Sequence, residues 1–310
     1  MSSDPQQIYD VLIIGGGGAG LTAALYTSRA KLSTLLIEKL APGGQIALTD
    51  LVENYPGFPE GITGGEISQR MEEQAKRYGT EIRYEEAETL EKKNGKFFVK
   101  MAAGEVVSAR SIILAMGASY RRVGVPGEKE LTGRGVSYCA TCDGAFFKEK
   151  EVVVIGGGDS AMQEGIFLTR FATRLTVIHR RDKLRANPLL QERAKGNPKI
   201  QFVWDTVITE VVGGKKVEKV KLKNLKTGEA RDFKTDGVFV FIGHDPNTSF
   251  LKGFVELDEK GYVKTGEKLQ TSIAGVFACG EVRAGAVQQL VSCCGEGCEA
   301  ALAAQAYLEH

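Results

Sequence analysis

The chain has 310 residues, and its 40 lysines and arginines balance 39 aspartates and glutamates to a net charge of +1. This balance gives no electrostatic reason to expect nucleic acid or an anionic membrane as a partner. No apolar run reaches the roughly 18 residues of a membrane span, and the first ten residues do not have the pattern of a secretory signal.

The length predicts two domains, each large enough to bury a core of its own. The 38 glycines show no collagen period, so they indicate many tight turns and close backbone approaches. The six cysteines are few for this length. They favour a reducing cytoplasm, where a close pair of cysteines is more often catalytic or metal-binding than a permanent bridge.

The first predicted element is an apolar strand over residues 11–14, followed by Gly15, Gly17 and Gly20 in the spacing GxGxxG. A helical pattern comes next, and then a second strand over residues 34–37 that ends at Glu38. Such glycines let the backbone approach a pyrophosphate at the helix N-terminus, and an acid at this place can bond a ribose diol. The stretch predicts a site for FAD or NAD, and a glycine-rich turn without a ligand is the alternative.

Further along the chain, residues 137–147 read SYCATCDGAFF. By themselves, Cys139 and Cys142 are compatible with half of a zinc site, a structural disulfide or a working dithiol. A zinc site needs two more ligands at a suitable spacing, and the other four cysteines lie far along the chain, so we expect no metal.

A second dinucleotide pattern begins with a strand over residues 152–155, with Gly156 and Gly158 in the first two glycine positions and Ala161 in the third. The place of the acid is taken by His179, and three arginines follow it: Arg180, Arg181 and Arg185. A guanidinium cluster binds a 2′-phosphate that an acid would repel, so this half predicts NADPH. The alternative is a solvated basic start of a helix.

Each half then continues in an alternating β region and ends in an apolar strand closed by Gly117 or Gly243. A short strand over 274–281 and a helix over about 288–308 complete the chain. We predict an α/β protein with two Rossmann-like, three-layer (ββα) nucleotide-binding domains, the second inserted in the first. Residues 1–116 and 246–310 would bind FAD, and residues 117–245 would bind NADPH and carry the dithiol.

The chain resembles the low-molecular-weight thioredoxin reductases, a class of FAD-dependent pyridine nucleotide-disulfide oxidoreductases. The resemblance is nearly end to end and rests on GGGGAG, PGGQ, ENYPGFP, GRGVSYCATCDG, GGGDSA, HRRDKLRA, GHDPNT and GVFACGEV. It implies a homodimeric enzyme that passes electrons from NADPH through FAD to the Cys139–Cys142 pair and on to thioredoxin. Cys139 would attack thioredoxin, Cys142 would interact with the flavin, and Asp143 would be the general acid. For Asp143, a helix cap is the alternative.

The resemblance also implies the residues that bind each cofactor. Those for FAD are Gly15, Gly16, Gly17, Gly18, Ala19, Gly20, Glu38, Gln45, Asn54, Ala87, Gly280, Glu281 and Gln289. Those for NADPH are Gly156, Gly158, Asp159, Ser160, Ala161, His179, Arg180, Arg181 and Arg185.

The sequence departs from the family pattern near its C-terminus. Cys279 and Glu281 stand where an alanine and an aspartate are usual, and Gln288 replaces an arginine near the expected approach of the nicotinamide. The departure at Gln288 keeps open an alternative donor such as ferredoxin or reduced flavin. A further alternative, of a different class, is a non-catalytic, nucleotide-binding redox sensor. Four further cysteines form either a buried inert set or a thiol relay: Cys279, Cys293, Cys294 and Cys298.

Overall fold

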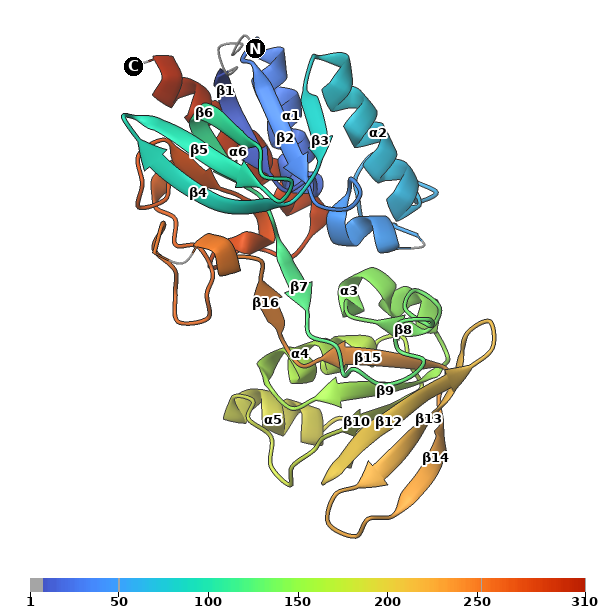
Figure 1. Cartoon of the computed structure of the whole chain (residues 1–310). Helices are drawn as coiled ribbons and strands as arrows, with labels where there is room; N and C mark the ends of the chain where they lie inside the picture. The colour runs from blue at the N-terminus through green and yellow to red at the C-terminus, as the bar shows by residue number, and fades with distance from the viewer. Residues whose placement is uncertain (1–7, 50, 252, 310) are drawn as a thin grey trace. The chain divides into compact units, whose positions relative to one another are not determined.

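The computed structural model describes residues 8–49, 51–251 and 253–309, which form two compact units (Figure 1). The first unit is Met1–Ser119 with Asp245–His310, and the second is Tyr120–His244. Strands β7 (Ala118–Tyr120) and β16 (His244–Pro246) pair with each other where the chain passes between the units. The sequence predicts no secretory signal in the first ten residues. Residues 1–7 of that stretch lie outside the described residues.

The first unit is built on a sheet in the order β3-β2-β1-β6-β5-β4, with β17 also pairing with β6. Strands β3, β2, β1, β6 and β17 run parallel, whereas β4 and β5 join by antiparallel pairing. The bounds are β1 Ile8–Ile14, β2 Thr34–Glu38, β3 Glu81–Tyr84, β4 Ala87–Lys93, β5 Lys96–Met101, β6 Val106–Leu114 and β17 Val276–Ala278.

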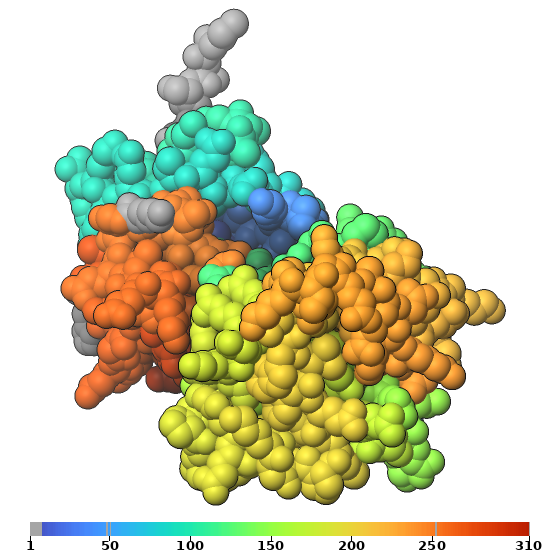
Figure 2. Space-filling view, turned by 90° about the horizontal axis from the view of Figure 1, so that it is seen from below, coloured from blue at the N-terminus to red at the C-terminus, as the bar shows by residue number. Residues whose placement is uncertain are grey.

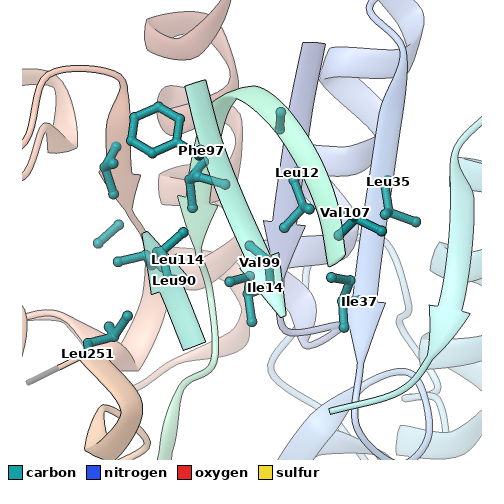
Figure 3. Close-up of a cluster of buried hydrophobic side chains, with 14 of the residues drawn as sticks. Leu12, Ile14, Leu35, Ile37, Leu90, Phe97, Val99, Val107, Leu114 and Leu251 are labelled. Carbon is teal, nitrogen blue, oxygen red and sulfur yellow. The ribbon is translucent and has the colours of Figure 1, made fainter. Parts of the chain in front are cut away.

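Three helices cover one side of this sheet: α1 (Gly18–Arg29), α2 (Gly64–Arg77) and α6 (Leu290–Glu309). Helix α6 crosses α1 closely at Gly297. A Cβ on this residue would lie 2.2 Å from the Ala19 carbonyl oxygen, so only glycine fits there. A second core lies on the other side of β1 and β2, where their side chains pack with those of β4 and β5. Figure 3 shows Leu12, Ile14, Leu35 and Phe97 in this core. The alternation of buried faces along β1 and β2 therefore produces two cores, one on each side of the sheet.

The stretch between β2 and α2 has structure of its own. It contains the 3-10 helix η1 (Gly44–Leu48) and a β-bridge between Val52 and Ile62, which pack with Ile67 into a small core. Three further short 3-10 helices lie between β16 and α6: η3 (Ser249–Leu251), η4 (Glu267–Leu269) and η5 (Gly280–Val282).

The second unit repeats the three layers. Its parallel sheet has the order β11-β10-β9-β15-β8, and an antiparallel sheet β12-β13-β14 packs on one side of it. Helices α3, α4 and α5 cover the other side. Figure 2 shows the antiparallel strands, coloured gold to orange, at the surface of this unit.

The bounds in the second unit follow chain order. The strands are β8 Val136–Ser137, β9 Glu151–Gly156, β10 Arg174–Ile178, β11 Ile200–Val203, β12 Thr206–Gly213, β13 Val217–Asn224, β14 Ala230–Lys234 and β15 Gly237–Phe241. The helices are α3 Ala140–Asp143, η2 Gly144–Phe147, α4 Asp159–Leu168 and α5 Pro188–Lys195.

The predicted α/β fold with two Rossmann-like parallel sheets is confirmed. Within the described ranges, no helix combines the length and the apolar character that crossing a bilayer requires.

Candidate functional site

Cys139 and Cys142 are joined by a disulfide at the start of helix α3. Strand β8 ends two residues earlier, and Cys139 occupies the N-cap position, where its Sγ accepts a hydrogen bond from the Cys142 backbone N–H at 3.2 Å. Both side chains are half-buried, so the sulfurs are not sealed in the core. In the described part of the chain, no three His, Cys, Asp or Glu side chains gather as a metal site would require.

Asp143 lies one residue beyond the disulfide, at the last position of α3. Its Oδ2 accepts a hydrogen bond of 2.5 Å from the Ser137 hydroxyl, across the turn that carries both cysteines. The Asp143 side chain makes no cap hydrogen bond to the following helix η2, so the structure does not favour the helix-cap alternative.

A second carboxyl contacts the same short helix from α4. Glu164 forms a hydrogen bond with the Ala140 backbone, and burial raises the pKa of Glu164 above its ordinary value. Desolvation disfavours the charged form of the carboxyl and raises its pKa, whereas the hydrogen bond from the backbone lowers the pKa and offsets part of this rise. The dithiol helix is therefore held by side chains from two elements, β8 and α4.

The turn between β1 and α1 has the shape of a pyrophosphate site. A Cβ on Gly20 would lie 1.8 Å from the Gly15 carbonyl oxygen, and Gly15 itself has a φ of +105° with the Ala115 carbonyl oxygen 2.4 Å from its Cβ position. Helix α1 begins after Gly17 without a side-chain cap, and the space at the Gly17 Cβ position is open for 4 Å. Uncapped N–H groups facing open space suit a phosphate anion.

Glu38 ends strand β2 beside this turn, as the fingerprint predicts. Its Oε2 accepts from the Gly16 N–H at 2.6 Å and its Oε1 from the Leu40 N–H at 2.9 Å. These bonds hold the half-buried carboxylate at the mouth of the glycine turn, where a ribose hydroxyl could donate to it. The residues of this turn therefore fit the adenosine and pyrophosphate part of FAD.

The remaining predicted flavin residues come from separate parts of the first unit. The Gln45 Nε2 donates to the Ala118 carbonyl oxygen, and the Asn54 Nδ2 donates to the Gln289 Oε1 at 3.1 Å. The second bond brings together two predicted residues that are 235 positions apart. Ala87 is the first residue of β4 and lies half-buried against the first core.

The segment at Gly280 and Glu281 is held by a buried ion pair that the motifs did not reveal. The Glu296 Oε2 on α6 accepts from the Gly280 N–H at 2.7 Å and from the Arg283 Nε at 2.7 Å, and Arg283 Nη2 also donates to Glu296 Oε1. Glu296 is only 9% exposed, so this bidentate pair fixes the segment in a partly dry environment.

Burial raises the pKa of Glu281 to about 6. Glu281 also lines a small polar pocket of about 160 Å³ together with Gln288 and Arg283. Two of the three departures from the family pattern, Glu281 and Gln288, therefore line the same cavity of the first unit.

The four other cysteines are free thiols, and two of them, Cys279 and Cys293, adjoin the Gly280 segment. Cys279 is fully buried, and burial raises the pKa of Cys279 far above its usual range. Burial raises the pKa of Cys293 to about 12, with the charge of Glu281 as a further cause. Because exchange requires a thiolate, Cys279 and Cys293 suit the inert set better than the relay.

In the second unit, the turn between β9 and α4 repeats the glycine architecture. A Cβ on Gly156 would lie 2.4 Å from the Phe241 carbonyl oxygen and 2.7 Å from the Ala161 Cβ, so helix and strands approach closely here. At Gly157, an added Cβ would meet the His179 ring at 2.3 Å. Apart from its chain neighbours, no described residue lies within 4 Å of the Cβ position of Gly158. This glycine is the N-cap of α4, which has no side-chain cap hydrogen bond.

The predicted phosphate cluster divides into one buried and three exposed residues. His179 is 6% exposed, its Nε2 bonds the Lys183 carbonyl oxygen at 3.0 Å, and burial lowers the pKa of His179. Arg180, Arg181 and Arg185 are exposed. The ring of His179 therefore supports the loop, and the arginines are the groups that could meet a phosphate.

Backbone contacts shape the loop that carries these arginines. The Arg185 N–H donates to the Gly157 carbonyl oxygen at 2.7 Å, and the Asn187 N–H donates to Asp159 Oδ1 at 2.6 Å. Helix α5 begins only at Pro188, so the arginines lie in a loop and not at a helix start. Asp159 thus braces the loop, while its exposed neighbour Ser160 lies in the first turn of α4.

Comparison with known proteins decides the family. The sequence model of the family described as "Pyridine nucleotide-disulphide oxidoreductase" matches residues 9–304. The chain belongs to this family. It is an oxidoreductase, and the resemblance to thioredoxin reductases that its motifs indicate is confirmed by the relatives below.

A protein of Bacillus subtilis (strain 168) named thioredoxin reductase is 51% identical over 306 residues, which are 98% of this chain and 96% of the relative. One of Mycolicibacterium smegmatis with the same name is 48% identical over 307 residues, covering 99% of this chain and 98% of the relative. The crystal structure of thioredoxin reductase from Streptococcus pyogenes MGAS5005 has a TM-score of 0.94 at 44% identity, and the match covers 97% and 98% of the two chains.

Several residues around the candidate site were missed by reading motifs: Ser137, Glu164, Arg283 and Glu296. Ser137 lies inside a quoted motif but has no spacing rule that marks it. Glu296 had a signal, because it is a charged residue between two glycines in a stretch of mostly small and apolar residues at the start of α6.

Proposed function

We propose that the protein is a thioredoxin reductase that uses NADPH and FAD to reduce the Cys139–Cys142 disulfide, which in turn reduces the disulfide of thioredoxin. The observation that carries the proposal is the Cys139–Cys142 disulfide, with Asp143 beside it, in the same unit as a nucleotide turn followed by three exposed arginines. When bound, a flavin supplies the two-electron carrier between the nicotinamide and the disulfide.

The side chains of this chain support each part of the proposal. Two thiols held in one turn have a high effective concentration, so the pair can open and reclose without losing its partner. Cys139 is the nucleophile toward thioredoxin, and Cys142 is the sulfur that meets the flavin. Asp143 is the general acid that gives a proton to a departing thiolate.

The arginines support NADPH over NADH as the donor. A 2′-phosphate beyond β10 would meet Arg180, Arg181 and Arg185, and each charge-assisted bond contributes about 1.5–3 kcal/mol. We expect the triple substitution of these arginines by alanine to raise the KM for NADPH at least tenfold and to leave the KM for NADH nearly unchanged. Arg193→Ala, which removes an arginine of α5 outside the cluster, is the matched control.

The deciding experiment is anaerobic reduction of the purified flavoprotein. NADPH should bleach the flavin spectrum, and added thioredoxin should then be reduced with turnover. Flavin that stays oxidised with NADPH but is reduced by ferredoxin would establish the other donor. Reduction by NADPH without turnover on thioredoxin would establish a redox sensor, and either result contradicts the proposal.

The proposal includes a homodimer in a reducing cytoplasm. Exposed apolar side chains on α1 and α6, among them Tyr26, Val291 and Leu302, support association of two copies. Sedimentation of the flavoprotein at micromolar concentration tests this part, and a monomeric mass would refute it.

A further inference from the structure

The hydroxyl of Ser137 is the meeting point of three hydrogen bonds around the dithiol. It lies 2.5 Å from Asp143 Oδ2, 3.2 Å from the Cys139 carbonyl oxygen, and it accepts the Cys139 N–H at 3.1 Å. Ser137 is 4% exposed, so water does not readily replace any of these partners. The geometry thus links the carboxyl beside the disulfide directly to the backbone of the first cysteine.

A hydroxyl has one proton and two lone pairs; this arrangement uses the proton and one lone pair when Asp143 is ionised, and the proton and both lone pairs when Asp143 is protonated. When Asp143 is ionised, Ser137 donates to its Oδ2, and 2.5 Å is within the usual range for a hydroxyl bonded to a carboxylate. When Asp143 is protonated, the acid can donate to Ser137 Oγ, and the serine proton then turns to the Cys139 carbonyl oxygen. The Cys139 N–H donates to Ser137 Oγ in both states.

We propose that Ser137 is a positioning residue that orients the Asp143 carboxyl and keeps it hydrogen-bonded both before and after it gives up its proton. The inference rests on the proposed function, in which Asp143 is the acid. Without the hydroxyl, the Cys139 N–H loses this acceptor in both charge states, and the ionised carboxyl loses a donor.

Ser137 assists the proton transfer that accompanies reduction of the disulfide. Reduction of the Cys139–Cys142 bond takes one hydride equivalent from the nicotinamide donor and one proton, and it gives two thiols. Asp143 gives that proton to the thiolate formed when the sulfur–sulfur bond breaks, and becomes a carboxylate. It recovers a proton from solvent before the next cycle, and Ser137 changes its donor direction each time.

Other ionisable groups also contact this region. Glu164 of α4 bonds the backbone of Ala140 in α3, and burial raises the pKa of Glu164. On the strand side, Tyr138 donates from its hydroxyl to the buried Glu128 at 2.9 Å. Because Glu164 could also titrate, the test must assign any change with pH to Asp143.

The test compares Ser137→Ala and Ser137→Thr in the flavin-loaded enzyme. Ser111→Ala is the matched control, since Ser111 is also a buried serine in a strand and donates to the Gly275 carbonyl oxygen at 3.0 Å. Turnover with NADPH and thioredoxin is measured from pH 5 to 9. Aspartate labelled with ¹³C at the side-chain carboxyl reports the titration of Asp143, assigned by the signal that Asp143→Asn removes.

In Ser137→Ala we expect kcat to fall about tenfold, a part of the 10²–10⁴ that general acids contribute. The carboxylate loses a donor, so the Asp143 signal should titrate at a pH about one unit higher. Ser137→Thr should restore both values, and Ser111→Ala should change neither. In the Asp143→Asn background, adding Ser137→Ala should change kcat less than twofold.

An unmoved Asp143 signal in Ser137→Ala, or a further tenfold loss in the Asp143→Asn background, would overturn the inference. If Ser137→Ala does not fold, Ser137→Thr decides, because an altered titration in that variant contradicts a role for the hydroxyl. The titration needs neither nucleotide nor thioredoxin. Wild-type enzyme that fails to reduce thioredoxin would therefore refute the proposed function while the Asp143 signal still tests Ser137.

Discussion

Replacing Glu281 by glutamine should stabilise the flavin-free protein at neutral and alkaline pH. Burial raises the pKa of Glu281 from an ordinary value of 4.5 to about 6. A carboxyl whose pKa is raised on folding binds protons more tightly in the folded state, so the folded protein loses stability as pH rises from about 4.5 through 6. Glutamine has nearly the same shape and carries no charge at any pH.

The magnitude follows from the size of the shift. A change of about 1.5 pKa units corresponds to about 2 kcal/mol at about 1.4 kcal/mol per unit. Glu281 keeps partial contact with solvent, so about 2 kcal/mol is the upper limit. The gain from Glu281→Gln should approach this limit at pH 8 and fall below about 0.5 kcal/mol at pH 4.5, where the wild-type carboxyl is protonated in a large part of both states.

Urea unfolding at the two pH values measures the effect. Far-UV circular dichroism follows the whole chain, while the single tryptophan, Trp204, lies in the second unit and reports on that unit alone. The gain should be seen in the dichroism transition of the first unit, which contains Glu281. Glu259→Gln, at an exposed glutamate of the same unit, serves as the control and should not change stability at either pH.

Two results would refute this reasoning. A gain of equal size at pH 4.5 and pH 8 would mean that glutamine packs better and that ionisation has no part in it. A loss of stability at pH 8 would mean that the carboxylate has a favourable partner that outweighs its burial.

Three more outcomes are expected. Glu296→Gln should lower the free energy of unfolding by about 3 kcal/mol, because a buried ion pair is broken on one side, and it should weaken flavin binding in an equilibrium titration. Gly20→Ala should yield protein without flavin absorbance, since its Cβ would lie 1.8 Å from a carbonyl oxygen, whereas Gly65→Ala, with open space, should keep full flavin content. In the reduced, folded enzyme at pH 7.5, iodoacetamide should label Cys139 and Cys142 before any other cysteine by peptide mass spectrometry, and early labelling elsewhere would revive the relay.

Much of the fold could be predicted because its signals are local. The strand before Gly15, the glycine spacing and the acid at Glu38 occur within about two dozen residues, and each follows from the geometry of one strand–turn–helix unit. The same holds for the second unit. There the structure does not favour the alternative of a basic helix start, because α5 begins only at Pro188 and the arginines lie in the loop before it.

The site was less accessible to such reasoning, since its supports come from distant positions. Asn54 meets Gln289 across 235 residues, and Gly280 meets Glu296 only because α6 packs on one side of the first sheet. His179 occupies the expected place in the sequence, yet its ring turns inward against Gly157.

By itself, the sequence determined the two nucleotide turns, the pair of cysteines with its aspartate, and the cluster of arginines, because each depends on residue types at short spacing. Only the tertiary structure decided which groups hold these parts in place. The hydroxyl of Ser137 on Asp143 and the carboxylate of Glu296 on Gly280 depend on how strands and helices fold back on one another. Hydrogen bonds and burial depend on which residues are neighbours in space, and residue spacing in the sequence does not specify these neighbours when they come from distant segments.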